Sequence, residues 1–428
     1  MSHVPVYLVD GLRTPFLKSR NVPGPFSASD LAVFSGRSLL MKQPFLSSQL
    51  SEVIVGCAIP APTEPNIGRY IALRLGCGYK VPGWTVMRNC ASGLQSIDSA
   101  FSNVLLGRSD IVLAGGTDAL SRAPLIFNRD MTLLFSRLAL AKTLKNYLVL
   151  LSKFRLSFLK PIIALMEGLT EPTTGEMMGQ TAENLAHKFG ISRQQMDEYS
   201  VRSNLRAFSA QETGFFASEI TPIFDQEGIV YERDDGIRSD SSVEKLAKLK
   251  PVFDRKYGQV TAANSSQVTD GAAFVLIASE ESVEKFSLSP LARIVGIEWS
   301  ALDPSLMGLG PLYSIANLLR KYRLSLSDIG AWEINEAFAA QVIACLEAAK
   351  DSDFCSNERL WEGALGTIPE DRLNIDGGSI SLGHPVGASG ARITLHLANV
   401  MHRLDVRYGV ASICIGGGMG GSVLLEKV

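Results

Sequence analysis

Short apolar runs that suit β-strands alternate along this chain with longer stretches whose apolar residues recur at helical spacing. Strands are predicted at Val4–Val9, Val53–Ile59, Ile111–Ala114, Gly271–Ala278, Gly409–Ile415 and Ser422–Leu425. Helices are predicted at Leu94–Leu106 and Ile393–Leu404. Such alternation is typical of an α/β layer architecture with covered sheets.

Two distant stretches follow the same plan. In the first, Cys90-Ala91-Ser92-Gly93 opens a predicted helix, and the next strand is expected to end at Gly115-Gly116. In the second, Ala388-Ser389-Gly390 opens a helix, and the next strand leads into Gly416-Gly417-Gly418. A duplicated α/β unit explains this repeat better than chance does.

The stretch between the two halves, 122–258, has few strand-like runs and is predicted to be an inserted, mainly helical segment. Between Met131 and Met166 it carries six basic residues and no acidic one: Arg137, Lys142, Lys145, Lys153, Arg155 and Lys160. Large apolar residues such as Leu148 and Phe154 are interleaved with them. This tract is either a solvated amphipathic surface or a surface that faces a membrane or CoA.

Composition narrows the class of protein. At 428 residues the chain suits about three domains at roughly 150 residues each, and its net charge of −2 indicates no nucleic-acid partner. The six cysteines contain no CxxC pair, so free thiols are expected and no metal site. The chain shows no signal-peptide pattern at its start, no targeting tag at its end and no long uncharged apolar run, so a cytoplasmic location is expected.

Two residues are placed to do nucleophilic chemistry. Cys90 comes directly before a predicted helix, where N–H groups and the helix dipole stabilise a thiolate and lower the thiol pKa. His384 lies in the turn-rich segment GHPVGASG (383–390), and loops of this kind display functional groups. His187, His396 and His402 lie in helical patterns and His3 at the start of the chain. His384 is therefore the best candidate base, although a cysteine in a tight turn could also be structural.

Two further motifs lie in the second half. CIGGGMG (414–420) places Cys414 at a strand end before a glycine cluster. A dinucleotide site would require a helix next, whereas a final strand is predicted, so the glycines are interpreted as a close backbone approach with N–H groups available to an oxyanion. In NEAF (335–338), Asn335 follows an apolar run and could simply cap a helix.

Together and in this order, NCASG (89–93), NEAF, GHPVGASG and CIGGGMG resemble the thiolase family. The resemblance extends over nearly the whole chain, through DGLRTPF (10–16), AGGTDALSRAP (114–124), TAEN (181–184), AKLKPVF (247–253) and TAANSSQVTDGAA (261–273). It implies a thiolase fold of two like βαβαβαββ halves with five-stranded sheets, stacked in five layers (αβαβα). The implied domains are 1–121 with about 259–285, an inserted helical loop domain at 122–258 that covers CoA, and 286–428.

The resemblance also implies the roles of the site residues. Cys90 would be acylated and His384 would take its proton, while Cys414 would exchange the proton at C2 of the acetyl unit. Asn335 would hold a water that stabilises the enolate, and the N–H groups of Cys90 and Gly416 would form an oxyanion hole. CoA or acyl-CoA would be the substrate, with no bound cofactor. The residues implied to lie near CoA or the acyl path are Met178, Arg238, Phe253, Ala262, Ser266 and Phe338.

The resemblance leaves the subfamily open. Many short-chain thiolases have a histidine where Met177 stands, and the long basic tract is more similar to the β-subunits of trifunctional fatty-acid oxidation complexes. Those subunits usually carry histidine where this chain has Asn335. Thiolysis in fatty-acid β-oxidation is the expected function, with a short-chain acetoacetyl-CoA thiolase as the alternative. A homodimer or homotetramer is expected, and the 131–166 tract could contact an α-subunit or an anionic membrane, or line a groove for long acyl chains.

Three other classes of protein fit less well. A ketoacyl synthase usually uses two histidines and no terminal cysteine, so Asn335 and Cys414 argue against it. A non-catalytic lipid carrier would not need to keep all four reactive positions. A cysteine protease would give no role to GHPVG or to the terminal glycine cluster.

Overall fold

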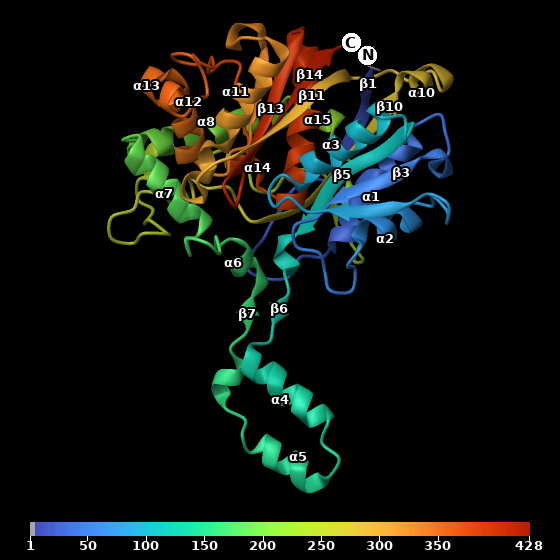
Figure 1. Ribbon diagram of the computed structural model, residues 1–428, viewed down its shortest axis with the longest axis vertical. Helices are drawn as coiled ribbons and strands as arrows, with labels where there is room; N and C mark the ends of the chain where they lie inside the picture. Colours follow the sequence, from blue (N-terminus) through green and yellow to red (C-terminus); the bar gives the residue numbers. More distant parts are fainter. Residues whose placement is uncertain (1–4) are drawn as a thin grey trace.

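The ten strands of the body form one mixed sheet with two halves, which a short pairing of β1 with β11 joins into a single hydrogen-bonded path (Figure 1); two short strand pairs lie outside it. The computed structural model describes residues 5–428. The N-terminal half-sheet consists of β4 (Gly83–Val86), β3 (Glu52–Gly56), β5 (Ile111–Ala119), β10 (Thr269–Ser279) and β1 (Val6–Arg13), with β2 (Leu17–Lys18) paired to β10. The C-terminal half-sheet consists of β12 (Ala331–Ile334), β13 (Tyr408–Ile415), β14 (Met419–Lys427) and β11 (Ala292–Ala301).

Helices cover both half-sheets and fill the space between them. The central layer is α3 (Ser92–Leu105) and α15 (Val386–Leu404), which pack against each other; α15 also packs on β5 and β10 of one half and on β12 and β13 of the other. The N-terminal outer layer is α1 (Ala28–Met41) and α2 (Ile67–Arg74). On the other side, α11 (Gly310–Tyr322) packs on β11, β13 and β14, and α12 (Ala339–Lys350) packs on α11. This is the predicted five-layer order.

The predicted α/β class and most of its elements are confirmed, with two differences in detail. β5 does not end at Gly115-Gly116 but runs on to Ala119. These glycines serve close packing, because a Cβ on Gly116 would lie 1.9 Å from the carbonyl oxygen of Gly387. The C-terminal half contributes four strands to the sheet instead of five, and Leu373 pairs with Trp332 only as an isolated bridge.

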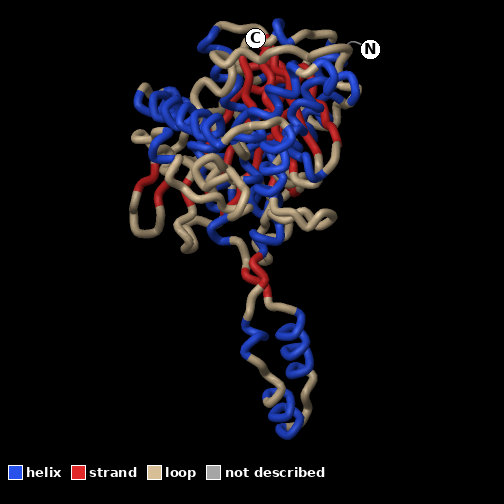
Figure 2. Tube along the Cα trace, turned by 90° about the vertical axis from the view of Figure 1, so that its left-hand side faces the viewer, coloured by secondary structure: helices blue, strands red, loops and turns tan. Residues whose placement is uncertain are grey.

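The segment 122–258 is mainly helical, as predicted, and part of it leaves the body of the molecule as an arm (Figures 1 and 2). The short strands β6 (Leu125–Ile126) and β7 (Ile162–Ile163) pair as its stalk, and α4 (Arg129–Ala139) and α5 (Leu144–Leu151) form its far end. The rest returns to the body as α6 (Ala164–Gly168), α7 (Met178–Lys188), α8 (Arg193–Glu212), β8 (Ile223–Phe224), β9 (Val230–Tyr231) and α9 (Val243–Leu246). α7 and α8 pack on α12 of the C-terminal half, so the inserted segment is not a body separate from the rest. The domain limits at 122 and 258 stay a prediction.

The remaining short helices are α10 (Glu280–Lys285), α13 (Ser352–Asn357) and α14 (Ser379–Leu382). Within residues 5–428, no helix combines the length and the apolar character needed to cross a bilayer. Val4, the first residue of the predicted strand at Val4–Val9, lies outside the described residues, as does His3.

A buried charge cluster ties the two halves to the inserted segment. Arg13 of β1 bonds Glu219 at 2.7 Å and Asp234 at 2.8 Å, and both partners belong to the insert. His396 of α15 bonds Glu219 at 2.9 Å and Asp376 at 3.2 Å. Burial opposes these charges, but His396 and Arg13 lower the pKa of Glu219 to about 2, and Glu219 in turn raises the pKa of His396 to about 10.

Replacing Glu219 with glutamine is expected to lower the free energy of unfolding by about 3–5 kcal/mol, because two buried cations lose their shared partner. The matched control is Glu212→Gln, whose 3.0 Å pair with Arg233 is about half exposed and should cost less than about 1 kcal/mol. Denaturant unfolding at pH 7 measures both. Equal losses in the two variants would contradict the assignment.

The stability that these charges contribute should depend on pH. The contribution of Glu219 to the free energy of unfolding should be present above its ordinary pKa of 4.5 and fade as the pH falls toward 2. The contribution of His396 should be present below its ordinary pKa of 6.5 and fade as the pH rises toward 10.

Candidate active site

Cys90 lies in a tight turn directly before the central helix α3. Asn89 adopts a left-handed φ of 45°, a conformation that asparagine tolerates better than most residues, and α3 begins at Ser92. The Asn89 side chain donates to the carbonyl oxygen of Gly416 at 2.9 Å, and the N–H of Gly416 lies close enough to the Cys90 thiol to lower its pKa. The turn thereby joins the nucleophile to the C-terminal glycine loop.

The prediction of a lowered thiol pKa at Cys90 is wrong for the unliganded protein. Burial raises the pKa above its ordinary value of 9.0, and the N–H of Gly416 offsets this only in part. Loss of hydration thus outweighs the helix N-terminus. A neighbouring base is needed to take the thiol proton.

His384 is oriented for that task by a serine of its own motif. Its Nδ1 lies 2.6 Å from the Ser389 hydroxyl, which donates to the carbonyl oxygen of Pro385 at 3.1 Å. The hydroxyl therefore accepts from Nδ1–H, which leaves Nε2 as the unprotonated atom. Nε2 is buried and has no partner among the described residues. Burial, followed by the charge of Arg392, lowers the pKa of His384 to about 4, so the ring is neutral at pH 7.

The contact between the two central helices brings these residues to one place. Cys90 precedes the N-terminus of α3 and His384 precedes that of α15. A Cβ on Gly93 would lie 2.6 Å from the carbonyl oxygen of Gly387, so the backbones of the two helix starts touch. The nucleophile comes from one half of the chain and the base from the other.

Cys414 is buried and lies one residue before the end of β13 in the C-terminal half. Burial, followed by the nearby Cys90, raises the pKa of its thiol far above the ordinary value, so it is a proton donor at rest. Gly417 and Gly418 turn the chain at φ of 92° and 72° into β14. The element after the glycines is thus a strand, as predicted, and not the helix of a dinucleotide site.

Asn335 does not cap a helix. It follows β12, whereas α12 begins four residues later at Ala339. Its Oδ1 accepts a hydrogen bond of 2.6 Å from Ser379. Its Nδ2 is buried and has no partner among residues 5–428, which suits an amide that holds a water or a substrate oxygen.

An apolar cavity of about 140 Å³ adjoins His384. It contains His384 and four of the six residues expected near substrate, namely Met178, Phe253, Ser266 and Phe338. The rings of Phe253 and Phe338 pack edge to face, with their centroids 6.1 Å apart. The Phe253 ring packs so closely on Gly179 that a Cβ at that position would clash with it. The rest of its wall is mostly apolar: Leu120, Leu165, Leu169, Met177, Val268 and Val386.

The other two expected contacts, Arg238 and Ala262, line a separate small cavity. Gln267 lies in the walls of both cavities. The two cavities are therefore neighbours, as the expected path of CoA and its acyl chain requires. None of the six basic residues of the arm lines either cavity. Three of them line a separate cavity of about 700 Å³ on the arm itself, between α4 and the stretch that follows α5. A groove for long acyl chains along the tract therefore stays a prediction.

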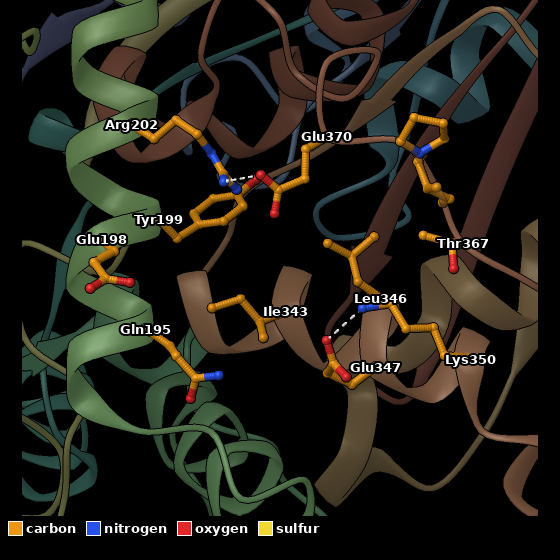
Figure 3. Close-up of a pocket in the computed structure, with 12 residues that line it drawn as sticks. Gln195, Glu198, Tyr199, Arg202, Ile343, Leu346, Glu347, Lys350, Thr367 and Glu370 are labelled. Atoms are coloured by element: carbon orange, nitrogen blue, oxygen red, sulfur yellow. Dashed lines mark hydrogen bonds and ion pairs between the residues drawn. The ribbon is translucent and has the colours of Figure 1, made fainter.

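A larger cavity of about 330 Å³ lies between α8, α12 and the loop at 367–370 (Figure 3). The ion pair of Arg202 with Glu370, at 2.7 Å, spans it. None of the predicted site residues lines it. Its buried Tyr199 donates to Glu336, the residue after Asn335, at 3.0 Å.

The sequence did not single out four residues that hold the site together: Asn89, Ser389, Ser379 and Gln267. Asn89 and Ser389 stand inside recognised motifs, so their positions could have suggested a role. Nothing in the pattern around Ser379 or Gln267 predicts their contacts. All six cysteines are free, and the part of the chain that the structure describes holds no cluster of three metal-ligand side chains.

Comparison with known proteins gives the family. The model of the thiolase N-terminal domain matches residues 6–281, and that of the thiolase C-terminal domain matches residues 288–427. This chain belongs to the thiolase family. It is therefore an acyltransferase that uses CoA thioesters, and the family supports CoA-dependent thiolysis as its reaction.

Several relatives within the thiolase family cover the whole chain. The mitochondrial trifunctional enzyme subunit beta of Bos taurus is 36% identical over 98% of this chain and 88% of its own length. A probable acetyl-CoA acyltransferase of Staphylococcus aureus is 35% identical over 99% of both chains. The crystal structure of human mitochondrial 3-ketoacyl-CoA thiolase is similar with a TM-score of 0.84 at 34% identity, covering 99% of both chains.

Proposed function

We propose that this thiolase cleaves 3-ketoacyl-CoA of medium or long chain to acetyl-CoA and a shortened acyl-CoA, as a step of fatty-acid β-oxidation. The observation that carries the proposal is that the starts of α3 and α15 touch, with Cys90 just before one helix and His384 just before the other. Cys90 also lies close enough to Cys414 to raise the pKa of its thiol. The apolar cavity next to His384 supports an acyl chain longer than acetyl.

The geometry supports a two-stage reaction. Nε2 of His384 takes the thiol proton of Cys90, whose sulfur attacks the 3-keto carbonyl; the Gly416 N–H stabilises the developing oxyanion. The C2–C3 bond then breaks, its electron pair passes to the enolate of acetyl-CoA, and the neutral thiol of Cys414 protonates C2. The protonated His384 then returns a proton to the Cys414 thiolate, and the neutral imidazole takes the proton of a CoA thiol. The CoA sulfur accepts the acyl group, and the departing Cys90 thiolate recovers its proton from His384.

A thiolysis series from four to sixteen carbons tests the chain length. The kcat/KM of thiolysis should rise from four carbons to a maximum at eight or more, since each CH₂ of the acyl chain that is buried adds about 0.8 kcal/mol of binding free energy. Acetoacetyl-CoA should be a poorer substrate. A maximum at four carbons would identify the alternative, a short-chain acetoacetyl-CoA thiolase.

We also propose that the arm docks on an anionic membrane surface. The enzyme would then be cytoplasmic and peripherally associated with the membrane. All six basic residues of the tract are exposed, and so are large apolar residues of the same arm, among them Leu140, Leu144, Leu148 and Leu156. Each cation near an anionic surface contributes about 1 kcal/mol. The alternative partner for the arm is an α-subunit of a trifunctional complex. The oligomeric state of the enzyme, a homodimer or homotetramer, also stays a prediction.

Co-sedimentation with vesicles of anionic and neutral lipid measures the docking. Binding should require anionic lipid, fall as salt rises, and drop at least about tenfold when Lys142, Lys145 and Lys153 become glutamate. The matched control reverses three exposed charges of the body, Lys42, Lys80 and Arg108, and should keep binding. If wild-type protein ignores anionic vesicles at low salt, the membrane proposal is wrong and the α-subunit becomes the better occupant.

A further inference from the structure

The amide of Asn335 is held by a buried relay that reaches it from α15. Arg392, on α15, donates from Nη2 to the Ser379 hydroxyl at 3.3 Å. Ser379, the first residue of α14, donates to Oδ1 of Asn335 at 2.6 Å. All three side chains are at most 1% exposed, so water does not compete for these bonds.

The chemistry of the three groups allows only one direction for the relay. A guanidinium is always charged and only donates, so Arg392 uses a lone pair of the Ser379 hydroxyl. The hydroxyl proton must then go to an acceptor, and the only one it meets among the described residues is Oδ1 of Asn335. If the amide were reversed, the hydroxyl would face two donors and its own proton would have no acceptor. Nδ2 therefore points away from Ser379, and it is the atom without a partner.

The other end of Arg392 is also anchored. Its Nη1 donates to Glu333 at 3.3 Å, and Glu333 is a residue of β12, the strand that leads into Asn335. The backbone N–H of Asn335 donates to the carbonyl oxygen of Ser412 at 2.9 Å. Backbone and amide are thus restrained by separate contacts, and only the Ser379 bond decides which amide atom faces the reaction.

We propose that Ser379, polarised by Arg392, is a positioning residue that sets the orientation of the Asn335 amide so that Nδ2 alone is presented to the water or oxygen stabilised in the C–C bond step. This proposal rests on the proposed thiolysis and on the role of Asn335 in stabilising the enolate that the resemblance to thiolases implies. Without the serine, the amide is free to turn its oxygen to the reaction side, where it would repel an enolate instead of stabilising it.

The test compares two reactions of one enzyme. Exchange of label between CoA and acetyl-CoA needs acylation of Cys90 but no C–C bond chemistry, whereas thiolysis needs both. Ser379→Ala should lower kcat of thiolysis by about 10- to 100-fold, the cost of a misoriented group, with KM for CoA and the exchange rate within about twofold of wild type. Intact exchange also shows that the variant is folded.

The matched control is Ser381→Ala, on the same short helix. Ser381 is equally buried, but its hydroxyl donates to the carbonyl oxygen of Gly378 at 2.8 Å and does not meet Asn335. It should change neither reaction. In an Asn335→Ala background, Ser379→Ala should cost nothing more, because the group it positions is gone.

Three outcomes distinguish failure of the Ser379 role from failure of the Asn335 role. If Asn335→Ala impairs thiolysis but Ser379→Ala does not, the positioning role is wrong and the role of Asn335 stands. If Asn335→Ala itself leaves thiolysis intact, the assignment of Asn335 fails first. If Ser379→Ala lowers exchange and thiolysis equally, Ser379 is merely structural and the proposal is overturned.

Discussion

Replacing Cys90 with alanine should abolish thiolysis, with a loss of at least about 10,000-fold, because the reaction has no other route to an acyl-enzyme. Wild-type enzyme incubated with acetyl-CoA should gain one acetyl group, and peptide mass spectrometry should find it on the peptide that contains Cys90. The Cys90→Ala variant should gain none.

Cys77→Ala is the matched control for this experiment. Cys77 is buried in the outer core of the N-terminal half, and burial raises its pKa to about 11. The variant should keep both the label and the activity. A label on Cys57 or Cys77 of the wild-type enzyme would contradict the mechanism.

Replacing His384 with alanine and Cys414 with serine should divide the reaction into its two stages. His384→Ala should lower label exchange and thiolysis together, by about 100- to 10,000-fold each, because acylation of the half-buried Cys90 thiol, whose pKa is raised, needs a base. Cys414→Ser should leave exchange nearly intact and lower thiolysis by a similar factor, because a serine hydroxyl is too weak an acid to protonate the enolate. Equal and mild effects from both would overturn the assignment.

The pH dependence of wild-type exchange adds an independent measurement. Burial, followed by Arg392, lowers the pKa of His384 to about 4, so the base stays neutral well below its ordinary value of 6.5. The acid limb of kcat/KM for the free enzyme should therefore lie near pH 4 and not near pH 6.5. Because the unfolded chain binds this proton more readily, the stabilising contribution of the neutral ring should fall as the pH drops from 6.5 toward 4.

The sequence alone determined the family-level features of this protein. Its apolar periodicity predicted six strands of the sheet and the two central helices, and its four motifs identified Cys90, His384, Asn335 and Cys414. These features are local: a helix start, a glycine turn or a reactive side chain is written in consecutive residues. The helical character of the insert and its basic tract could be predicted in the same way.

Only the tertiary structure decided how these residues act. Burial reversed the predicted direction of the pKa shift at Cys90, because loss of hydration depends on what other segments cover the thiol. The place of the basic tract on a projecting arm and the Arg392–Ser379–Asn335 relay depend on contacts between segments far apart in the chain. Desolvation and side-chain hydrogen bonds of this kind arise when the halves pack together, so no pattern within one segment encodes them.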